Sequence, residues 1–519
     1  MKKNTWLEII IVLVVAGFIM AYRLGGLPLL DPDEPVYAQT AREMLAAQDF
    51  ISPRIYGDFW YDKPPMYYWL VAGAMKIAGQ TELAARLPSA LLAVGGALLV
   101  YAGGRSLVNR RAGLIAGLAL ATSLEYFYLG KAAVTDVTLT FFMSACLLLY
   151  LRQKYRLAYI AAGLAVLTKG PVGFVLPGLI ILIHLISTRS LGTLRRIKLL
   201  SGSLLVLAVS LPWYWLMYQY HGMDFVNTFL GFHNVTRFLQ PEHPSGSLWY
   251  YYLPVLGVGF FPWTIFLVQA LAAAIRAGRD GKEGGELSFL VIWAGVIFVF
   301  FSLSQTKLIS YILPMFPPLA LLVGWYIDSR LRAAAPGVFK IPAALLTLLI
   351  VLLEAALFIT AKQSIPELLP GAMLAGVLLA AVAGSAWYTA CTSRNKGFVG
   401  VIVTGMAAFV IVLMTAVLPA AAPWFSVKDL AGEFQAHYDG QAPVYIIKAY
   451  RPGFTYYTGT PGTELADGEQ LATLVTGDSG KAYFVIKKKT YQTLPPAEQG
   501  KLRLLATQKD VALVLKANN

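Results

Sequence analysis

The feature that most constrains this chain is a succession of apolar runs, each about as long as a membrane is thick. A membrane-crossing helix needs about 20 mostly apolar residues, because the hydrocarbon layer is about 30 Å thick and each residue advances about 1.5 Å. We therefore expect thirteen spans, of which the two beside Lys169 are the shortest. The expected spans cover residues 6–24, 86–108, 112–129, 135–152, 156–168, 171–188, 199–219, 250–276, 286–304, 308–328, 339–361, 368–390 and 397–419.

The composition supports a membrane protein and excludes an ordinary soluble enzyme. Hydrophobic residues make up 57% of the chain and charged residues 13%, against about 45–50% and about 25% in soluble domains. The formal charge of +14 is typical of basic cytoplasmic loops, so no nucleic-acid partner is expected. Cys146 and Cys391 both lie in apolar runs, so the chain offers neither a disulfide framework nor a zinc cluster.

The distribution of basic residues orients the spans. Alternate connections carry twenty Lys and Arg residues, and the short connections on the opposite side carry five. Because basic residues concentrate on the cytoplasmic side, the N-terminus is expected in the cytoplasm and the C-terminus outside. The first run follows two lysines and lacks a convincing small-residue cleavage site, which indicates an uncleaved anchor.

Three segments are expected outside the hydrocarbon on the outer face: the loop 25–85, the loop 220–249 and the tail from 424. The tail contains strand-like and helix-like stretches in about 95 residues, enough for one small domain. The expected strands are 443–448, 482–487, 502–506 and 511–515, and the expected helices follow Ser426 and cover 451–457 and 468–475. The prediction is a polytopic α-helical membrane protein (1–423, including both loops) with a C-terminal extracytoplasmic α/β domain (424–519).

The first outer loop carries adjacent carboxylates at Asp33 and Glu34. Pro35 suits the first turn of a helix, and either carboxylate suits its cap. An apolar stripe then predicts a helix along the membrane surface; its residues are Val36, Ala41, Met44, Leu45 and Phe50. Asp33 is either a helix cap alone or a carboxylate held at the outer interface as a general base or electrostatic stabiliser.

Asp62 and Lys63 follow in the same loop, among aromatic residues that include Trp60 and Tyr61. Pro64 favours extended backbone at Lys63, which lets the ammonium reach away from the local chain toward a lipid phosphate. The alternative is an aromatic belt with a lysine that snorkels to the interface.

Ionisable residues at the ends of later spans extend this set. Asp136 begins the fourth expected span, where a charge is costly unless it faces a polar cavity or a partner. Lys169, between two spans, is either a site residue or a snorkelling lysine. Lys307 and Tyr311 lie at the outer end of the tenth span and add a cation and a phenol.

The loop 220–249 holds three of the five histidines, including His233 and His243. His233 and Arg237 are four residues apart, so a helix places them on one face. Together they can bind a phosphate, or His233 and Asp62 can hold a divalent metal, although this spacing is not a zinc signature.

Together these residues place carboxylates and cations on the outer face, without a glycine-rich nucleotide loop or a Ser-His-Asp order. An enzyme on that face has no access to cytoplasmic nucleotide sugars or ATP. The pattern therefore indicates a substrate attached to a lipid, with a phosphate for Lys63 and Arg237 to bind.

This combination resembles the polyprenyl-phosphate-sugar-dependent membrane glycosyltransferases of GT-C type. The resemblance is greatest to the lipid A 4-amino-4-deoxy-L-arabinose transferases, and protein O-mannosyltransferases are more distant. It covers roughly residues 1–330 in order. The matching stretches are Asp33-Glu34, Tyr37-Ala38, 41–45, Asp62-Lys63-Pro64, 84–89, Asp136, 167–170, 233–238, His243 with 249–251, and Lys307 with 311–314.

The resemblance implies roles for these residues. The catalytic carboxylate is expected at Asp33 or Glu34, with Asp33 preferred, and Asp136 belongs to the same group. The other implied sets are the phosphate-binding residues Lys63, Arg237, Tyr311 and Lys307, the metal-binding residues Asp62 and His233, and the cavity or acceptor residues Tyr37, Trp60, Tyr61, Lys169 and His243. This chain departs from the family pattern, which has Glu where Asp62 stands and one residue fewer between the histidine and Arg237. No cofactor other than a divalent metal is implied.

The implied reaction is an inverting transfer of a sugar from undecaprenyl phosphate in a bacterial inner membrane, with 4-amino-4-deoxy-L-arabinose and lipid A as the first expectation. A hydroxyl acceptor needs Asp33 as a base, whereas an anionic lipid A phosphate needs it only for orientation. The alternatives are a protein O-mannosyltransferase or another hexose transferase, an oligosaccharide ligase or polymerase, and a lipid-linked sugar transporter. The transporter fits less well because the polar residues gather at one face and no repeat is present.

Overall fold

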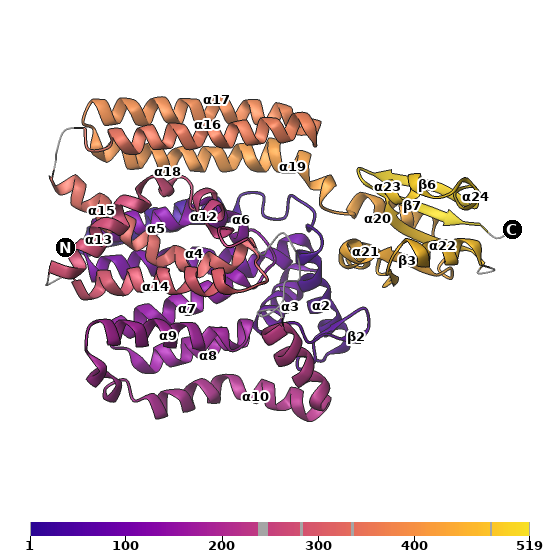
Figure 1. Ribbon diagram of the computed structural model, residues 1–519, viewed down its shortest axis with the longest axis horizontal. Helices are drawn as coiled ribbons and strands as arrows, with labels where there is room; N and C mark the ends of the chain where they lie inside the picture. The colour runs from indigo at the N-terminus through magenta and orange to yellow at the C-terminus, as the bar shows by residue number, and fades with distance from the viewer. Residues whose placement is uncertain (1, 237–247, 281–283, 334–336, 478–479, 518–519) are drawn as a thin grey trace.

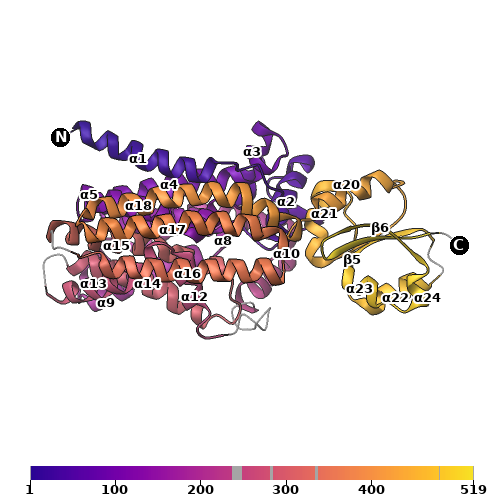
Figure 2. The same ribbon diagram turned by 90° about the horizontal axis from the view of Figure 1, so that it is seen from above.

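The computed structural model describes residues 2–236, 248–280, 284–333, 337–477 and 480–517. Most of these residues form long helices that lie roughly along one direction, and a smaller part built around a sheet follows at one end (Figure 1). Figure 2 shows this sheet beyond the ends of the helices rather than beside them, whereas the N-terminus lies at the other end of the helical part.

The helical part is built from apolar helices at every range where a span was expected. They are α1 (Lys2–Ala21), α4 (Glu82–Leu107), α5 (Arg110–Ala121), α6 (Leu124–Gly130), α7 (Asp136–Leu151), α8 (Tyr155–Lys169), α9 (Val172–Ser187), α10 (Leu199–Phe225), α12 (Tyr252–Gly259), α13 (Leu267–Asp280), α14 (Gly284–Leu303), α15 (Phe316–Ala333), α16 (Lys340–Gln363), α17 (Leu369–Cys391) and α18 (Asn395–Val412). In the described part of the chain, seven helices are long and apolar enough to cross a membrane, or nine if each of two bent pairs is one span. A multi-pass membrane protein is thus supported, and the count of thirteen stays a prediction.

The two bent pairs contact each other at their breaks. Helices α5 and α6 meet at 62°, and α12 meets the helix from Trp263 to Gly278 at 108°. The indole of Trp263 donates to the Thr122 hydroxyl at 2.8 Å, and the Leu124 N–H donates to the Phe261 carbonyl at 3.0 Å. Each break thereby supplies hydrogen-bond partners for polar groups that the other break would leave unpaired in an apolar environment.

The first outer loop folds into α2 (Asp33–Ala47), α3 (Met66–Ala78) and a short antiparallel pair, β1 (Arg54–Ile55) and β2 (Asp58–Phe59). One detail differs from expectation. The cap of α2 is Pro32, which makes no side-chain capping bond, and Asp33 and Glu34 occupy the first turn instead. Eight residues of α2 are buried, because it packs between α3 and the C-terminal segment. That α2 lies along a membrane surface stays a prediction.

The C-terminal segment contains a five-stranded sheet of order β4-β3-β5-β7-β6. Strand β3 is parallel to β4 and β5, and β7 is antiparallel to β5 and β6. Apolar clusters lie on both faces of the sheet, which the helices cover. The elements are α20 (Lys428–His437), β3 (Val444–Ile447), α21 (Arg451–Thr458), β4 (Thr463–Leu465), α22 (Gly468–Thr476), β5 (Ala482–Lys487), α23 (Lys488–Thr493), α24 (Pro496–Gln499), β6 (Leu502–Gln508) and β7 (Val511–Lys516). Sequence reasoning missed β4, which has only three residues. That this segment is a separate extracytoplasmic domain stays a prediction.

Polar contacts join the C-terminal segment to the chain around α2. The Asp31 carboxylate accepts the N–H groups of Gly453 at 2.9 Å and Val427 at 3.2 Å. A side chain at Gly453 would collide with this carboxylate. From within α2, the Arg42 guanidinium donates to the backbone carbonyls of Thr455 and Tyr456. The C-terminal segment therefore helps to hold the loop that carries Asp33.

Candidate functional site

The adjacent carboxylates of α2 have different surroundings. Glu34 is buried and pairs with Arg86 of α4, with Nε to Oε1 at 2.8 Å and Nη2 to Oε2 at 2.6 Å. It also accepts the N–H groups of Leu30 at 2.9 Å and Ala133 at 2.8 Å. Asp33 is exposed and makes no hydrogen bond to any described residue. Glu34 is therefore fully engaged in the fold, and Asp33 is available to another molecule.

Arg86 is the residue that sequence reasoning missed. Its guanidinium also donates to the carbonyls of Leu24, Leu27 and Pro28, so it ties the loop before α2 to α4. The available signal was an arginine at the start of an apolar run, where an unpaired charge is costly. Sequence reasoning treated it as the beginning of a span.

Several charged groups act on Asp33. Its side chain reaches water, yet protein atoms crowd it closely enough that lost hydration is the largest cause of a raised pKa. The nearby carboxylates of Asp136, Asp62 and Glu34 raise this pKa further, and the Lys63 ammonium lowers it. Since such influences fall with distance, the structure brings Asp33, Asp62, Lys63 and Asp136 into one electrostatic neighbourhood.

Asp136 and Lys169 form the second charged pair of this neighbourhood. Asp136 is the first residue of α7 and Lys169 the last of α8, and Nζ lies 2.6 Å from Oδ1. The same ammonium lies 4.7 Å from the centre of the Tyr311 ring, which is a cation–π distance. Three residues that were predicted separately, from three parts of the chain, thus lie together.

Lys63 pairs with its neighbour Asp62, with Nζ to Oδ1 at 2.8 Å. Both side chains are 15% exposed, so the pair lies near the surface of the protein and a ligand can reach it. A phosphate that binds Lys63 shares the ammonium with Asp62 or replaces Asp62 as its partner.

Aromatic residues form the walls beside these charges. The buried Tyr37 ring contacts Tyr67 edge-on, with ring centres 5.4 Å apart, and lies 5.8 Å from Tyr68. Burial first, and then the charge of Asp62, raises the pKa of the Tyr37 phenol, so it stays neutral. Trp60 packs against the main apolar core, while Tyr61 belongs to a separate aromatic cluster with Phe225 and His221.

The remaining predicted residues are not brought into this group by any described contact. Lys307 is buried, forms no ion pair with a described residue, and has a pKa lowered by burial. Arg237 and His243 lie outside the described residues, as does the side chain of His233. The described residues contain no group of three or more His, Cys, Asp or Glu that can hold a metal.

The arrangement supports a definite chemistry. Two ammonium groups, Lys63 and Lys169, can stabilise an anion, and the exposed Asp33 can accept a proton beside them. A buried Glu34–Arg86 pair fixes the turn from which Asp33 projects. Such a site fits the departure of a phosphate from a carbon that another oxygen attacks.

Comparisons with known proteins bear on the family and the fold of this chain. Residues 62–215 match the family model described as dolichyl-phosphate-mannose-protein mannosyltransferase. An uncharacterised protein of Aquifex aeolicus is 32% identical over 64% of this chain and 74% of its own length. The undecaprenyl phosphate-alpha-4-amino-4-deoxy-L-arabinose arabinosyl transferase of Edwardsiella ictaluri is 32% identical over 63% of this chain and 60% of its own. The chain thus spans less than two thirds of the length of that relative.

A solved structure is similar over almost the whole chain. ArnT from Cupriavidus metallidurans, bound to undecaprenyl phosphate, superposes with a TM-score of 0.81 at 23% identity, over 100% of this chain and 99% of that one. The oligosaccharyltransferase of Archaeoglobus fulgidus superposes more loosely, with a TM-score of 0.52 at 13% identity, over 94% of this chain and 70% of that one. Both likenesses concern the fold.

Proposed function

Since this chain belongs to the GT-C type membrane glycosyltransferases that use polyprenyl-phosphate sugars, we propose that it transfers a sugar from undecaprenyl phosphate to a cell-envelope acceptor. The transfer takes place on the outer face of the cytoplasmic membrane and inverts the anomeric carbon. The observation that carries this proposal is the exposed Asp33, which makes no hydrogen bond to a described residue and lies beside the Asp62–Lys63 and Asp136–Lys169 pairs.

Lys63 is the proposed ligand of the carrier phosphate, together with Arg237. As the bond between the anomeric carbon and the phosphate oxygen breaks, negative charge grows on the phosphate, and a nearby ammonium stabilises it. Lys63 can make this contact by exchanging the Asp62 carboxylate for the phosphate, because both charges are already partly out of water. Lys307 is proposed as a further ligand of the phosphate.

Asp33 is the proposed base. The acceptor oxygen forms its bond to the anomeric carbon while the phosphate leaves, and the hydroxyl proton passes to the Asp33 carboxylate. A raised pKa makes this carboxylate a better proton acceptor than an ordinary aspartate. One displacement of this kind inverts the configuration and needs no covalent intermediate. With an acceptor phosphate, which is already anionic, Asp33 orients the acceptor or the amino group of the sugar instead.

The Asp136–Lys169 pair has a proposed positioning role. It holds a second ammonium against the Tyr311 ring and keeps a compensated charge beside Asp33. The orientation of Lys169 therefore depends on Asp136. In this role Asp136 sets the direction of the cation rather than exchanging a proton.

The structure describes one member of the predicted metal pair, Asp62, whereas the side chain of His233 lies outside the described residues. The Asp62 carboxylate oxygen accepts from the Lys63 ammonium, which competes with any cation at that atom. No group of three or more metal-binding side chains occurs in the described residues.

The names of the relatives favour 4-amino-4-deoxy-L-arabinose as the sugar and undecaprenyl phosphate as its carrier, and we propose lipid A as the acceptor from the resemblance stated above. The family model over residues 62–215 favours a second candidate, the transfer of mannose or another hexose to a protein. The two candidates share the donor phosphate and differ in the acceptor. The acceptor is therefore what the experiment has to identify.

The test compares lipid A, cell-envelope glycans and envelope proteins by mass spectrometry in host cells with and without the protein. We expect a pentose-type mass increment on lipid A that disappears in Asp33→Asn. The matched control is Asp58→Asn, an exposed aspartate of β2 in the same loop, which should keep the increment. A hexose on protein would move the acceptor to the second candidate. Full transfer by Asp33→Asn would remove Asp33 from the mechanism.

A further inference from the structure

A cavity lies at the opposite end of the helices from Asp33. It has a volume of about 730 Å³ and is lined by the first residues of α8 and α10 and the chain just before them. Helix α8 has 15 residues, so its two ends are about 22 Å apart. Lys169, at its far end, belongs to the site described above, which makes this cavity a separate one.

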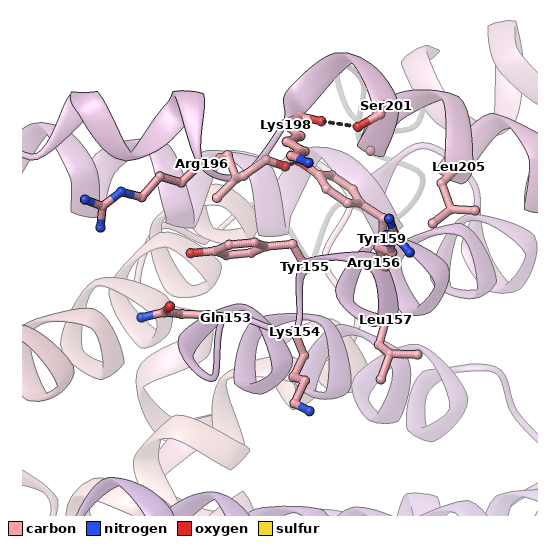
Figure 3. Close-up of a pocket in the computed structure, with 12 residues that line it drawn as sticks. Gln153, Lys154, Tyr155, Arg156, Leu157, Tyr159, Arg196, Lys198, Ser201 and Leu205 are labelled. Carbon is pink, nitrogen blue, oxygen red and sulfur yellow. Dashed lines mark hydrogen bonds between the residues drawn. The ribbon is translucent and has the colours of Figure 1, made fainter.

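The lining of the cavity is strongly basic. Lys154, Arg156, Arg196 and Lys198 line it, and no Asp or Glu does. Unlike the cations near Asp33, none of these four forms an ion pair with a described residue. Figure 3 shows the polar ends of Arg196, Tyr155 and Gln153 turned in the same direction, whereas the Lys154 amine points away from them. Cations gathered without acids repel one another, and an anion relieves that repulsion.

Two helix N-termini add to this preference for an anion. Helix α8 begins at Tyr155 and α10 begins at Leu199, and neither has a side-chain capping bond. The unpaired N–H groups of a first helical turn and the helix dipole both favour negative charge. Here they occur beside the unpaired cations of the cavity wall.

The shape of the cavity is fixed by packing. The Tyr159 hydroxyl donates to the Ile197 carbonyl at 3.1 Å, and its ring lies so close to Gly202 that a side chain there would overlap it. Lys198 has a left-handed backbone with φ of 51°, which is uncommon for a residue with a side chain. The Ser201 hydroxyl donates to the Lys198 carbonyl at 3.1 Å and supports this turn. The cations are thus presented on a preformed surface.

Large apolar side chains are exposed in the first turns of the same two helices, and Leu157 lines the cavity itself. Leu157 is 51% exposed, Leu200 is 79% exposed and Leu204 is 58% exposed. Since α10 is long and apolar enough to span a membrane, lipid chains are expected to cover such residues. A ligand that fits both features has a phosphate for the cations and acyl chains for the leucines.

We propose that this cavity binds the phosphate head group of an anionic membrane lipid. This binding is independent of the sugar transfer and takes place at the other membrane surface. A lipid fits better than a free phosphate compound because the exposed leucines adjoin the cations. The effect on the protein is to anchor the short segment between α9 and α10, which carries Arg196 and Lys198.

The test uses the full-length protein in nanodiscs of phosphatidylcholine, with or without phosphatidylglycerol, and measures thermal unfolding and lipid retention by native mass spectrometry. The cavity variant is R156Q/R196Q/K198Q. The matched control, K340Q/R394Q/K396Q, removes three exposed cations from the same predicted membrane side but outside the cavity. Sugar transfer is measured in parallel, and both variants should keep it within twofold.

We expect phosphatidylglycerol to raise the unfolding temperature of the wild type and of the control, and the cavity variant to retain phosphatidylglycerol at least tenfold more weakly. Equal losses in both variants would reduce the effect to general surface charge and overturn the proposal. Stabilisation by 10 mM inorganic phosphate as large as that by the lipid would assign the cavity to a soluble phosphate compound instead. No response to either anion would also overturn it.

Discussion

The two ends of the helical part handle positive charge in opposite ways. Near Asp33, each of the cations Lys63, Lys169 and Arg86 has a carboxylate partner within 2.8 Å. In the cavity between α8 and α10, four cations have no carboxylate partner among the described residues. The difference follows from burial, because the paired side chains are at most 15% exposed, whereas Arg156, Arg196 and Lys198 are exposed. Buried charges need a partner, and exposed ones can use water.

This contrast has consequences for what each end can bind. An anion near Asp33 has to compete with a carboxylate for its cation, so a ligand that supplies an equally good partner in the same place is favoured. The cavity makes no such demand, and its binding is expected to be less selective and more sensitive to salt. Substrate recognition fits the first end, and lipid anchoring fits the second.

The largest effect is expected when the most deeply buried ion pair, Glu34–Arg86, is broken. Glu34→Ala leaves the Arg86 guanidinium without its carboxylate and removes the acceptor of two backbone N–H groups. We expect the free energy of unfolding to fall by about 3–5 kcal/mol, as for other buried pairs that lose one partner. Thermal unfolding of the purified protein in detergent measures it. The control is Asp33→Asn, with an expected change within about 0.5 kcal/mol; equal stability of both variants would contradict the inferred structural role of Glu34.

The second effect concerns coupling between Asp136 and Lys169. Asp136→Asn and Lys169→Met should each lower the transfer rate more than tenfold, because each removes part of one unit. The double variant should then be about as slow as either single variant, with a coupling energy of about 2 kcal/mol, within the range for residues in contact. A double-mutant cycle on the transfer rate measures this. Additive losses would mean that the pair does not act together.

The sequence predicted single residues of the site more readily than their partnerships. Asp136 and Lys169 stand out because each is ionisable at the edge of an apolar run, and Asp33 and Lys63 because they lie in the polar motifs of the first outer loop. The pairing of Lys169 with Asp136 joins residues 33 positions apart, and that of Arg86 with Glu34 joins residues 52 apart. Such contacts depend on which helices pack together, which hydropathy does not encode.

For the fold, too, the sequence predicted single elements better than the contacts between them. The length of each apolar run located the helices, because membrane thickness fixes how many residues a span needs. The bends between α5 and α6 and after α12 were not predicted, because an apolar run has the same hydropathy whether the helix is straight or broken. The apolar stripe of α2 predicted a buried face, but such a stripe cannot show whether lipid or protein covers it. In the structure α21 and α3 pack against it.

The third prediction uses pH to sharpen the role of Asp33. Its neighbour Asp62 raises the pKa of Asp33, and Lys63 lowers it. A base works only when ionised, so transfer should fall as the pH drops through the pKa of Asp33. Asp62→Asn lowers that pKa and should move the acid limb of kcat/KM to lower pH.

The control for this profile is Asp58→Asn, which removes an exposed carboxylate from the same loop that is not among the charges acting on Asp33. Its acid limb should coincide with that of the wild type. If the limb of Asp62→Asn also stayed in place, Asp33 would not be the group that sets it.

The smallest effect belongs to the basic cavity. Arg196→Gln removes an exposed guanidinium that has no ion-pair partner among the described residues, so the free energy of unfolding should change by less than about 0.5 kcal/mol in neutral lipid. This small change should stabilise the protein, because one of the four like charges that line the cavity is gone. In phosphatidylglycerol the sign should reverse, since the wild type then gains an anion that the variant binds less well. Unfolding of both proteins in the two lipids measures this reversal, and a loss of the same size in both would mean that Arg196 stabilises the fold directly rather than through an anion.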